Sequence, residues 1–248
     1  MYNLNFISEK DFESHVSQTI KSYNNTLKSI NLKKFNSNVI DPIKLLFDKN
    51  IFKKTFDEII EDEISRQRDR TNTNSIGYFH QNIFKYIKGC EVPEEGWDII
   101  VSLPDLPKIY VEMKNKHNTM NSSSAQKTYI QMQNHILKNP DDKCFLVEVI
   151  APESRNVKWK CSINKTHVED ERIRRVSIDK FYSIVTGQND AFYQMCIQLP
   201  ATIEKIIKNN DSLSVEKDTV ISELKSKSDD MLMSLYKLAF STYDGFNF

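Results

Sequence analysis

Apolar residues recur at intervals of three and four positions along the first third of the chain, which is typical of amphipathic helices. This spacing predicts a first helix over residues 8–32, with Ser8 as its N-cap. A second helix is predicted over 42–68, with a proline at its first position. The polar stretch T-N-T-N-S then indicates a linker. A short helix over 76–87 follows and ends at Gly89.

The middle of the chain changes to strand-like runs. The runs G-W-D-I-I-V-S-L and Y-V-E-M-K are separated by L-P-D-L-P, which has the prolines of a turn. A helix over 122–137 and an apolar strand over 144–150, interrupted by Glu148, come next. Strand, strand, helix, strand is the order of an α/β core with a crossover helix. Beyond it, V-K-W-K-C-S-I indicates another strand, and R-V-S-I leads into the helix D-K-F-Y-S-I-V-T-G.

Helical patterns over 192–207 and 215–240 close the chain. The fold class is therefore α/β, with a mixed central sheet flanked by helices and with helical additions at both ends. A length of 248 residues suits one functional unit over 1–248. Within it we expect an N-terminal helical region (1–75), a core that carries the chemistry (76–200) and C-terminal helices (201–248).

Charged residues interrupt both strands that precede the crossover helix. Side chains alternate along a strand, so Glu112 and Lys114 share one face while Val111 and Met113 take the other. Asp98 interrupts the preceding strand, so Asp98 and Glu112 are expected to meet at neighbouring strand ends, beside Lys114. The structural alternative is a surface ion pair, which contributes roughly 0–1 kcal/mol.

Two carboxylates and a lysine in the pattern D-x13-E-x-K suit phosphodiester hydrolysis. A divalent ion would activate the attacking water and offset charge on the leaving oxygen. Asp98, Glu112 and the carbonyl of Met113 are hard oxygen ligands of the kind that Mg²⁺ prefers. Lys114 would orient or deprotonate the water, or neutralise the transition state.

Composition narrows the remaining possibilities. The chain has 34 basic residues (Lys and Arg) and 34 acidic residues (Asp and Glu), so its net charge is zero. The whole protein therefore does not attract a polyanion such as DNA, and any such partner must bind to a local basic patch. The four cysteines form no C-x-x-C pair, which argues against a zinc site. No glycine lies in a G-x-G-x-x-G or P-loop motif, which disfavours nucleotide-binding folds of those types. The sequence shows neither a signal peptide nor a membrane-spanning apolar run, so a soluble, cytoplasmic protein without a membrane partner is expected.

The strand–strand–helix order with Asp98, Glu112 and Lys114 resembles the PD-(D/E)xK nuclease core. The string V-E-M-K-N-K-H-N-T-M-N-S-S-S-A-Q-K-T-Y resembles one family of type II restriction endonucleases, whose members recognise GGNCC. The segments S-I-G-Y-F-H-Q-N-I-F-K-Y-I and S-I-D-K-F-Y-S-I-V-T-G resemble it as well, so the likeness covers about 67–200. It implies Mg²⁺-dependent cleavage of duplex DNA, with Asp98 and Glu112 as metal ligands and Lys114 as the catalytic lysine.

The sequence departs from the superfamily pattern before the first core strand. Many members carry a glutamate on the preceding helix, where this chain reads Y-F-H-Q-N. Either His80 or Gln81 positions water or metal there, or this ligand is absent; for His80 the alternative is a helix-surface or core hydrogen bond. Trp97 stands where the superfamily has its proline.

Polar residues after the catalytic strand are candidates for DNA contacts, to phosphates more than to bases. They are Asn115, Lys116, His117, Asn118, Asn121, Ser122, Ser123, Ser124 and Lys127. The alternative is a solvated loop. Two arginine clusters, Arg172/Arg174/Arg175 and Arg66/Arg68/Arg70, either bind DNA or form solvated faces, and Trp159 is expected in the core.

The resemblance implies double-stranded DNA as the partner. Since a two-fold symmetric protein matches a palindromic site most simply, a homodimer is expected, with the terminal helices as candidate interfaces. A cognate methyltransferase would be encoded separately. The alternatives are a structure-specific or repair nuclease on the same core, or a non-catalytic DNA-binding protein whose ion pair is structural.

Overall fold

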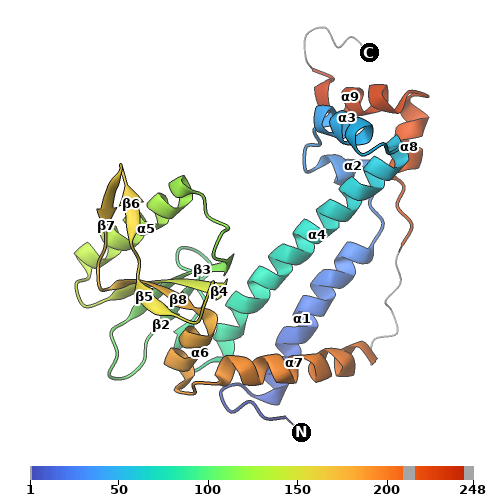
Figure 1. The fold of residues 1–248 in the computed structure, drawn as a ribbon. Helices are drawn as coiled ribbons and strands as arrows, with labels where there is room; N and C mark the ends of the chain where they lie inside the picture. The colour runs from blue at the N-terminus through green and yellow to red at the C-terminus, as the bar shows by residue number, and fades with distance from the viewer. Residues whose placement is uncertain (1, 209–215, 243–248) are drawn as a thin grey trace. The chain divides into compact units, whose positions relative to one another are not determined.

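The computed structural model describes residues 2–208 and 216–242. The chain forms two compact units (Figure 1). The core unit comprises 1–19 and 76–209, and the helical unit comprises 20–75 and 210–248. This division groups the first residues with the sheet, and joins the C-terminal helices to the N-terminal helical region.

A mixed sheet organises the core unit. Among the described residues six strands form it, in the order β1-β2-β3-β4-β8-β5. Strands β3, β4 and β8 run parallel, while β1, β2 and β5 are antiparallel to their neighbours. The strand bounds are β1 Cys90–Glu91, β2 Ile99–Val101, β3 Ile109–Lys116, β4 Lys143–Ile150, β5 Asn156–Lys158 and β8 Ile173–Ser177. This arrangement confirms an α/β fold with a mixed central sheet and flanking helices.

Helix α5 (Ser122–Lys138) is the crossover between the parallel strands β3 and β4. Its buried residues Tyr129, Met132 and Ile136 pack with residues of the sheet and with Trp159, which confirms Trp159 as a core residue. On α6 (Ile178–Thr186), Phe181 and Tyr182 contact Phe84 of the short 3₁₀-helix η1 (Ile83–Tyr86). A second ribbon joins β6 (Cys161–Ile163) to β7 (Thr166–Val168).

The helical unit has a separate apolar core. Residues of α2 (Leu32–Asn36), α3 (Pro42–Ile51), α4 (Phe56–Asn82), α8 (Val220–Lys227) and α9 (Met231–Phe240) supply it. Ile60, Val220, Leu224 and Leu235 are fully buried there. The helices α1 (Glu9–Leu27) and α4 contribute residues to both units, and α7 (Ala191–Lys208) belongs to the core unit.

The predicted linker T-N-T-N-S is wrong, because α4 continues through it to Asn82. Its polar side chains form hydrogen bonds within the helical unit: Thr26 donates to Asn72, and the Ser22 and Ser75 hydroxyls lie 2.6 Å apart. Ser75 also donates to a carbonyl one turn earlier. The residues of this polar helix–helix contact are of the same types as those of a linker, which is why the sequence alone indicated a linker here.

Other predicted helix boundaries are also wrong. The first helix ends at Leu27, and the second pattern breaks between α3 and α4, where Lys53 has a positive φ of 54°. The C-terminal pattern forms two helices, α8 and α9, and Val215 lies outside the described residues. The run V-K-W-K-C-S-I divides between β5 and β6, which belong to different sheets. In the described part of the chain, no helix has the length and apolar character of a membrane span.

Candidate active site

Asp98 is fixed to the central strand β3 through its backbone and its side chain. The Asp98 amide donates to the Val111 carbonyl at 3.0 Å, just before Ile99 pairs with Val111 in the antiparallel register. The Asp98 carboxylate accepts from the Met113 amide at 2.7 Å. The Asp98 side chain is thus held beside Glu112, as the alternation of residues predicts.

Glu112 and Lys114 form an ion pair on the same face of β3. The Lys114 Nζ donates to Glu112 Oε1 at 2.6 Å, and the side chains are 30% and 20% exposed for Lys114 and Glu112. Val111 and Met113 are buried on the opposite face. The pair is partly shielded from solvent, so its geometry is better fixed than that of an exposed surface pair.

Burial is the main cause that raises the pKa of Asp98, and the charge of Glu112 raises it further. The Met113 hydrogen bond and the Lys114 charge lower it, but the net direction is upward. The charge of Glu112 disfavours ionisation of Asp98, and a cation bound between the two carboxylates would offset this effect. The residues therefore fit a hard divalent ion with oxygen ligands.

The described side chains supply few ligands for such an ion. Within 2–208 and 216–242, no group of three or more His, Cys, Asp or Glu side chains is placed to hold a metal. The protein's share would be two carboxylates and the Met113 carbonyl, with water and substrate phosphate for the rest. Mg²⁺ is commonly held in this way.

Gln81 and His80, the two candidates from the preceding helix, have different surroundings. Gln81 Nε2 donates to the Asp98 carbonyl at 3.2 Å, so α4 contacts the residue that directly precedes β2. The His80 ring lies edge-on to Phe79, and no described residue is a hydrogen-bond partner for its buried Nδ1. Burial, and to a lesser extent the charge of His15, lowers the pKa of His80 to about 4. His80 is therefore neutral at pH 7.

Lowering the pH from 7 to 4 is expected to destabilise the core unit. Burial lowers the pKa of His15 to about 4 as well, from 6.5. Since both folded values lie below the unfolded value, the unfolded chain binds more protons between pH 6.5 and 4, and stability falls as the pH falls. The loss is on the order of 3 kcal/mol for each histidine. Thermal unfolding should depend less on pH in His80→Gln than in wild type or in the exposed control His167→Gln; equal dependence would contradict the assignment.

The polar segment after β3 is mostly exposed, as a DNA-contacting loop requires. Asn115 and Lys116 are the last two residues of β3. His117 is held against β4, because its amide donates to the Ile150 carbonyl at 3.0 Å. Asn121 caps α5 by accepting from the Ser124 amide at 2.8 Å, so its Oδ1 is committed to the helix. The other residues of the set are exposed at the loop and in the first turns of α5: Asn118, Ser122, Ser123 and Lys127.

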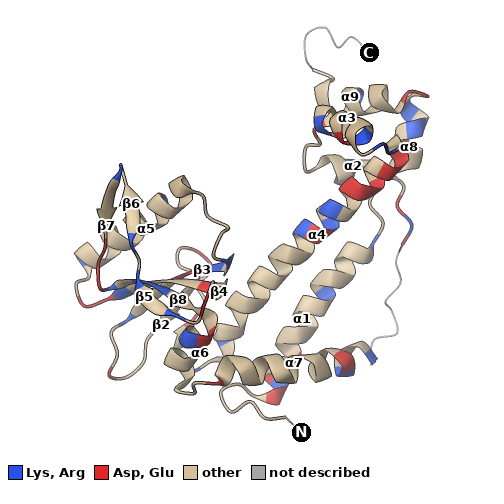
Figure 2. Ribbon diagram, viewed as in Figure 1, with Lys and Arg blue, Asp and Glu red and all other residues tan. Residues whose placement is uncertain are grey.

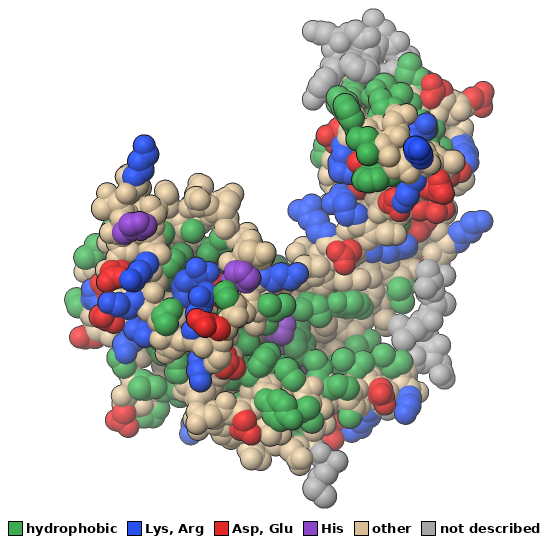
Figure 3. All heavy atoms as spheres, viewed as in Figure 1, with side chains coloured by type: hydrophobic (Ala, Val, Ile, Leu, Met, Phe, Trp, Pro, Cys, Tyr) green, Lys and Arg blue, Asp and Glu red, His purple; other side chains and the backbone are tan. Residues whose placement is uncertain are grey.

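The two arginine clusters are largely engaged in ion pairs. Arg172 pairs with Asp170, and Arg174 with Glu171, while Arg68 forms two bonds to Asp218 at 2.8 and 2.9 Å. Arg66 pairs with Glu63. Lysine, arginine and acidic side chains are mixed over the face drawn in Figure 3. Most arginines of the two clusters are thus paired with nearby acidic side chains and do not form a basic patch by themselves.

One acidic group near the site was not among the sequence candidates. Glu148 on β4 is 1% exposed and binds both Arg155 and Arg175. Its signal in the sequence is that it interrupts the apolar run C-F-L-V-E-V-I. Figure 2 marks acidic and basic positions close together where β3 and β4 lie.

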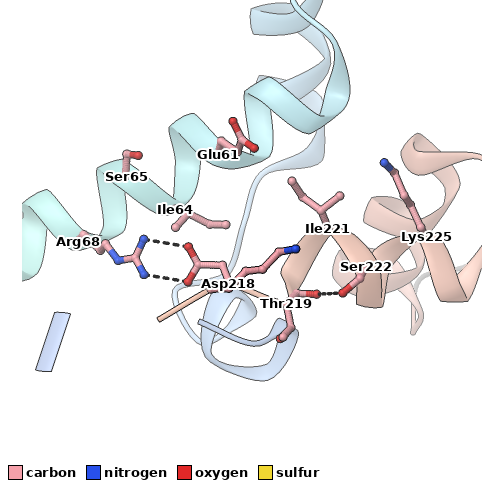
Figure 4. Close-up of a pocket in the computed structure, with 10 residues that line it drawn as sticks. Glu61, Ile64, Ser65, Arg68, Asp218, Thr219, Ile221, Ser222 and Lys225 are labelled. Carbon is pink, nitrogen blue, oxygen red and sulfur yellow. Dashed lines mark hydrogen bonds and ion pairs between the residues drawn. The ribbon is translucent and has the colours of Figure 1, made fainter. Parts of the chain in front are cut away.

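A cavity of about 790 Å³ lies in the helical unit (Figure 4). The Arg68–Asp218 pair lies at one side of it, and Glu61 and Lys225 extend from α4 and α8. Asp218 is committed to Arg68, so the cavity does not offer the adjacent carboxylates that Asp98 and Glu112 form. The candidate chemistry therefore lies in the core unit.

Comparison with known proteins identifies related sequences. Residues 4–208 match the model of the Eco47II restriction endonuclease family. The chain is 32% identical over 213 residues to the type II restriction enzyme Sau96I of Staphylococcus aureus, covering 83% of this chain and 81% of that protein. It is 28% identical over 219 residues to the type II restriction enzyme Eco47II of Escherichia coli, covering 82% and 88%.

Proposed function

The chain belongs to the Eco47II restriction endonuclease family and is a type II restriction endonuclease, and on this premise we propose that it cuts duplex DNA at GGNCC with Mg²⁺. The observation that carries the proposal is the placement of Asp98, Glu112 and Lys114. Asp98 directly precedes β2, and Glu112 and Lys114 lie on one face of the adjacent strand β3. The same placement supports membership of the PD-(D/E)xK superfamily.

The chain's own residues would orient the reactants. Asp98 and Glu112, with the Met113 carbonyl, would hold Mg²⁺, which when bound polarises the phosphoryl group and acidifies the attacking water. Asp98 is kept in place by the Met113 amide at its side chain and by Gln81 at its backbone carbonyl. Lys114, already a donor to Glu112, would turn toward the water or the phosphoryl oxygen and offset developing negative charge.

The proposed GGNCC specificity rests on the family resemblance of the β3–α5 segment. Exposed Asn118, Ser122, Ser123 and Lys127 supply donors for phosphates and base edges, and Lys116 and His117 precede them at the end of β3. Digestion of a sequenced plasmid with Mg²⁺ tests the proposal. Discrete fragments whose ends map to GGNCC support it, and random degradation would favour a repair or structure-specific nuclease instead.

We propose a homodimer in the cytoplasm, with a separately encoded methyltransferase that protects host DNA. A palindromic site is matched most simply by two catalytic sets related by two-fold symmetry. Helix α3 offers a surface for a second copy: Ile43, Phe47 and Ile51 lie at four-residue intervals and are 51%, 62% and 68% exposed. Such an apolar helix face suits an isologous contact.

Phe47→Asp is expected to shift the protein from dimer to monomer, because it buries a charge at the centre of the proposed contact. Sedimentation velocity over a range of concentrations measures the change. The control is Lys44→Ala on the same helix, whose side chain is exposed. A wild type that stays monomeric at all concentrations and on DNA would contradict the dimer, and an unchanged dimer in Phe47→Asp would exclude this surface.

A further inference from the structure

A buried carboxylate bound by two arginines lies on the same face of the sheet as the catalytic residues. Glu148 accepts from Arg155 Nη2 at 2.6 Å through one oxygen and from Arg175 Nη2 through the other. Glu148 is 1% exposed, but the arginine side chains are 17% and 27% exposed. The carboxylate is therefore internal, while both arginine side chains are partly exposed.

The strand register places this triad beside the candidate active site. Lys114 of β3 is paired with Glu148 of β4, which is paired with Ser177 of β8. Two residues earlier along β3, Glu112 lies on the same face and is paired with Leu146 of β4. Leu146 is in turn paired with Arg175 of β8. Neighbouring strands are about 4.8 Å apart, so the backbones of Glu112 and Arg175 are separated by roughly 10 Å across the sheet.

Several contacts hold the two arginines in place. The Arg175 guanidinium lies 6.0 Å from the centre of the Trp159 ring and donates to the His117 carbonyl at 3.4 Å, which links it to the polar loop. The Arg155 amide donates to the Ser177 hydroxyl at 2.9 Å, and the Ser177 amide donates back to the Arg155 carbonyl. The Arg175 guanidinium and the Arg155 backbone are thus fixed before any ligand arrives, and Glu148 holds the Arg155 guanidinium.

The charge of the triad does not cancel. Two guanidinium groups and one carboxylate leave a net charge of +1, and the buried Nε atoms of Arg155 and Arg175 have no hydrogen-bond partner among the described residues. A buried ion triad gives little stability compared with apolar residues of similar volume, so stability alone does not account for it. Planar guanidinium groups are well suited to bind phosphate oxygens.

We propose that Arg155 and Arg175 together bind one backbone phosphate of the DNA, next to the phosphate that is cut. Glu148 positions the two guanidinium groups and reduces their charge to the +1 that matches a single phosphate. This contact would fix the register of the strand across β3 and β4, so that the scissile phosphate lies over Asp98, Glu112 and Lys114. The inference rests on the proposed endonuclease function.

The salt dependence of DNA binding tests the proposal. Equilibrium binding of a GGNCC duplex and of a duplex without the site is measured without Mg²⁺ over a range of salt concentrations. Each phosphate contact contributes about 0.9 to the slope of log K against log [salt]. Arg155→Gln and Arg175→Gln should each lower the magnitude of the slope by about 0.9 and weaken binding to both duplexes by roughly tenfold.

Arg174→Gln is the matched control. Arg174 is next to Arg175 on β8, points to the opposite face and binds Asn156 and Glu171. Its replacement should leave the slope unchanged. If the glutamine variants do not fold, the apolar triad Glu148→Leu, Arg155→Met, Arg175→Leu replaces the whole ion cluster without leaving an unpaired charge. It should show the same loss of slope.

A slope equal to that of the wild type in the folded variants would overturn the proposal and leave a structural triad. Wild-type cleavage at GGNCC, measured on the same preparations, separates this failure from a failure of the proposed function. Site-specific cutting with unchanged slopes removes only the phosphate contact. Absence of cutting under varied metal and salt removes the proposal of Mg²⁺-dependent cleavage at GGNCC.

Discussion

Lys114→Ala is expected to lower the single-turnover rate of DNA cleavage by about 10²–10⁴-fold, while DNA binding without Mg²⁺ stays close to that of wild type. Lys114 donates to Glu112 at 2.6 Å and is 30% exposed, so its ammonium group can reach both the carboxylate and an incoming phosphate. Its positive charge offsets charge that develops only in the transition state. The rate should therefore fall much more than the affinity.

Lys116→Ala provides a control on the same strand. Lys116 lies two residues further along β3, hence on the same face, but its side chain is exposed at the strand end. Its replacement removes the same charge from the protein. Because Lys116 is a candidate DNA contact, the affinity should fall, but with enzyme at saturating excess the single-turnover rate should change only slightly. Quenched-flow cleavage of a labelled duplex, with enzyme in excess, measures both variants. Equal rates in Lys114→Ala and wild type would remove Lys114 from the chemistry and favour a structural ion pair.

The placement of the candidate catalytic residues could be predicted from the sequence because it depends on local rules. Alternation along β3 separates Glu112 and Lys114 from Val111 and Met113. The turn between β2 and β3 makes the two strands antiparallel neighbours, which places Asp98 beside Glu112. Each step involves neighbours within about fifteen residues. The crossover helix α5 and the parallel strand β4 follow from the same short-range order.

The features that the sequence did not predict depend on long-range contacts. The T-N-T-N-S stretch is helical because its polar side chains bond to α1, which lies some fifty residues earlier. Likewise, the role of Glu148 in β4 cannot be inferred from its sequence neighbours. It becomes clear only when the fold brings Arg155 and, from β8, Arg175 beside it. The partners of a polar residue decide its role, and no spacing rule identifies partners in other strands.

Asp98→Asn is expected to abolish cleavage, by roughly 10³-fold or more, and at the same time to stabilise the metal-free protein. The loss of activity follows because an amide is a poor ligand for a divalent cation. The gain in stability follows from the environment: burial, then the charge of Glu112, raises the pKa of Asp98 above its ordinary 3.8. The asparagine keeps the acceptor for the Met113 amide without the unfavourable charge.

The sign of the stability effect depends on pH. The folded pKa of Asp98 is the higher one, so the folded protein holds this proton more tightly, and wild type loses stability as the pH rises from below 3.8 through the folded value. Asp98→Asn does not incur this loss. At neutral pH the Tm of Asp98→Asn should therefore lie above that of wild type, and the advantage should disappear in acid.

Thermal unfolding with and without Mg²⁺ separates the two roles of Asp98. Wild type should gain stability as Mg²⁺ is added, because the ion binds only the folded protein, whereas Asp98→Asn should gain little. Asp105→Asn, in the turn between the same two strands, is exposed and should respond to Mg²⁺ as wild type does. A metal-free Asp98→Asn protein that melts below wild type would contradict the electrostatic argument. A full Mg²⁺ response in that variant would instead exclude Asp98 as a ligand, since the ion would then be held without its carboxylate.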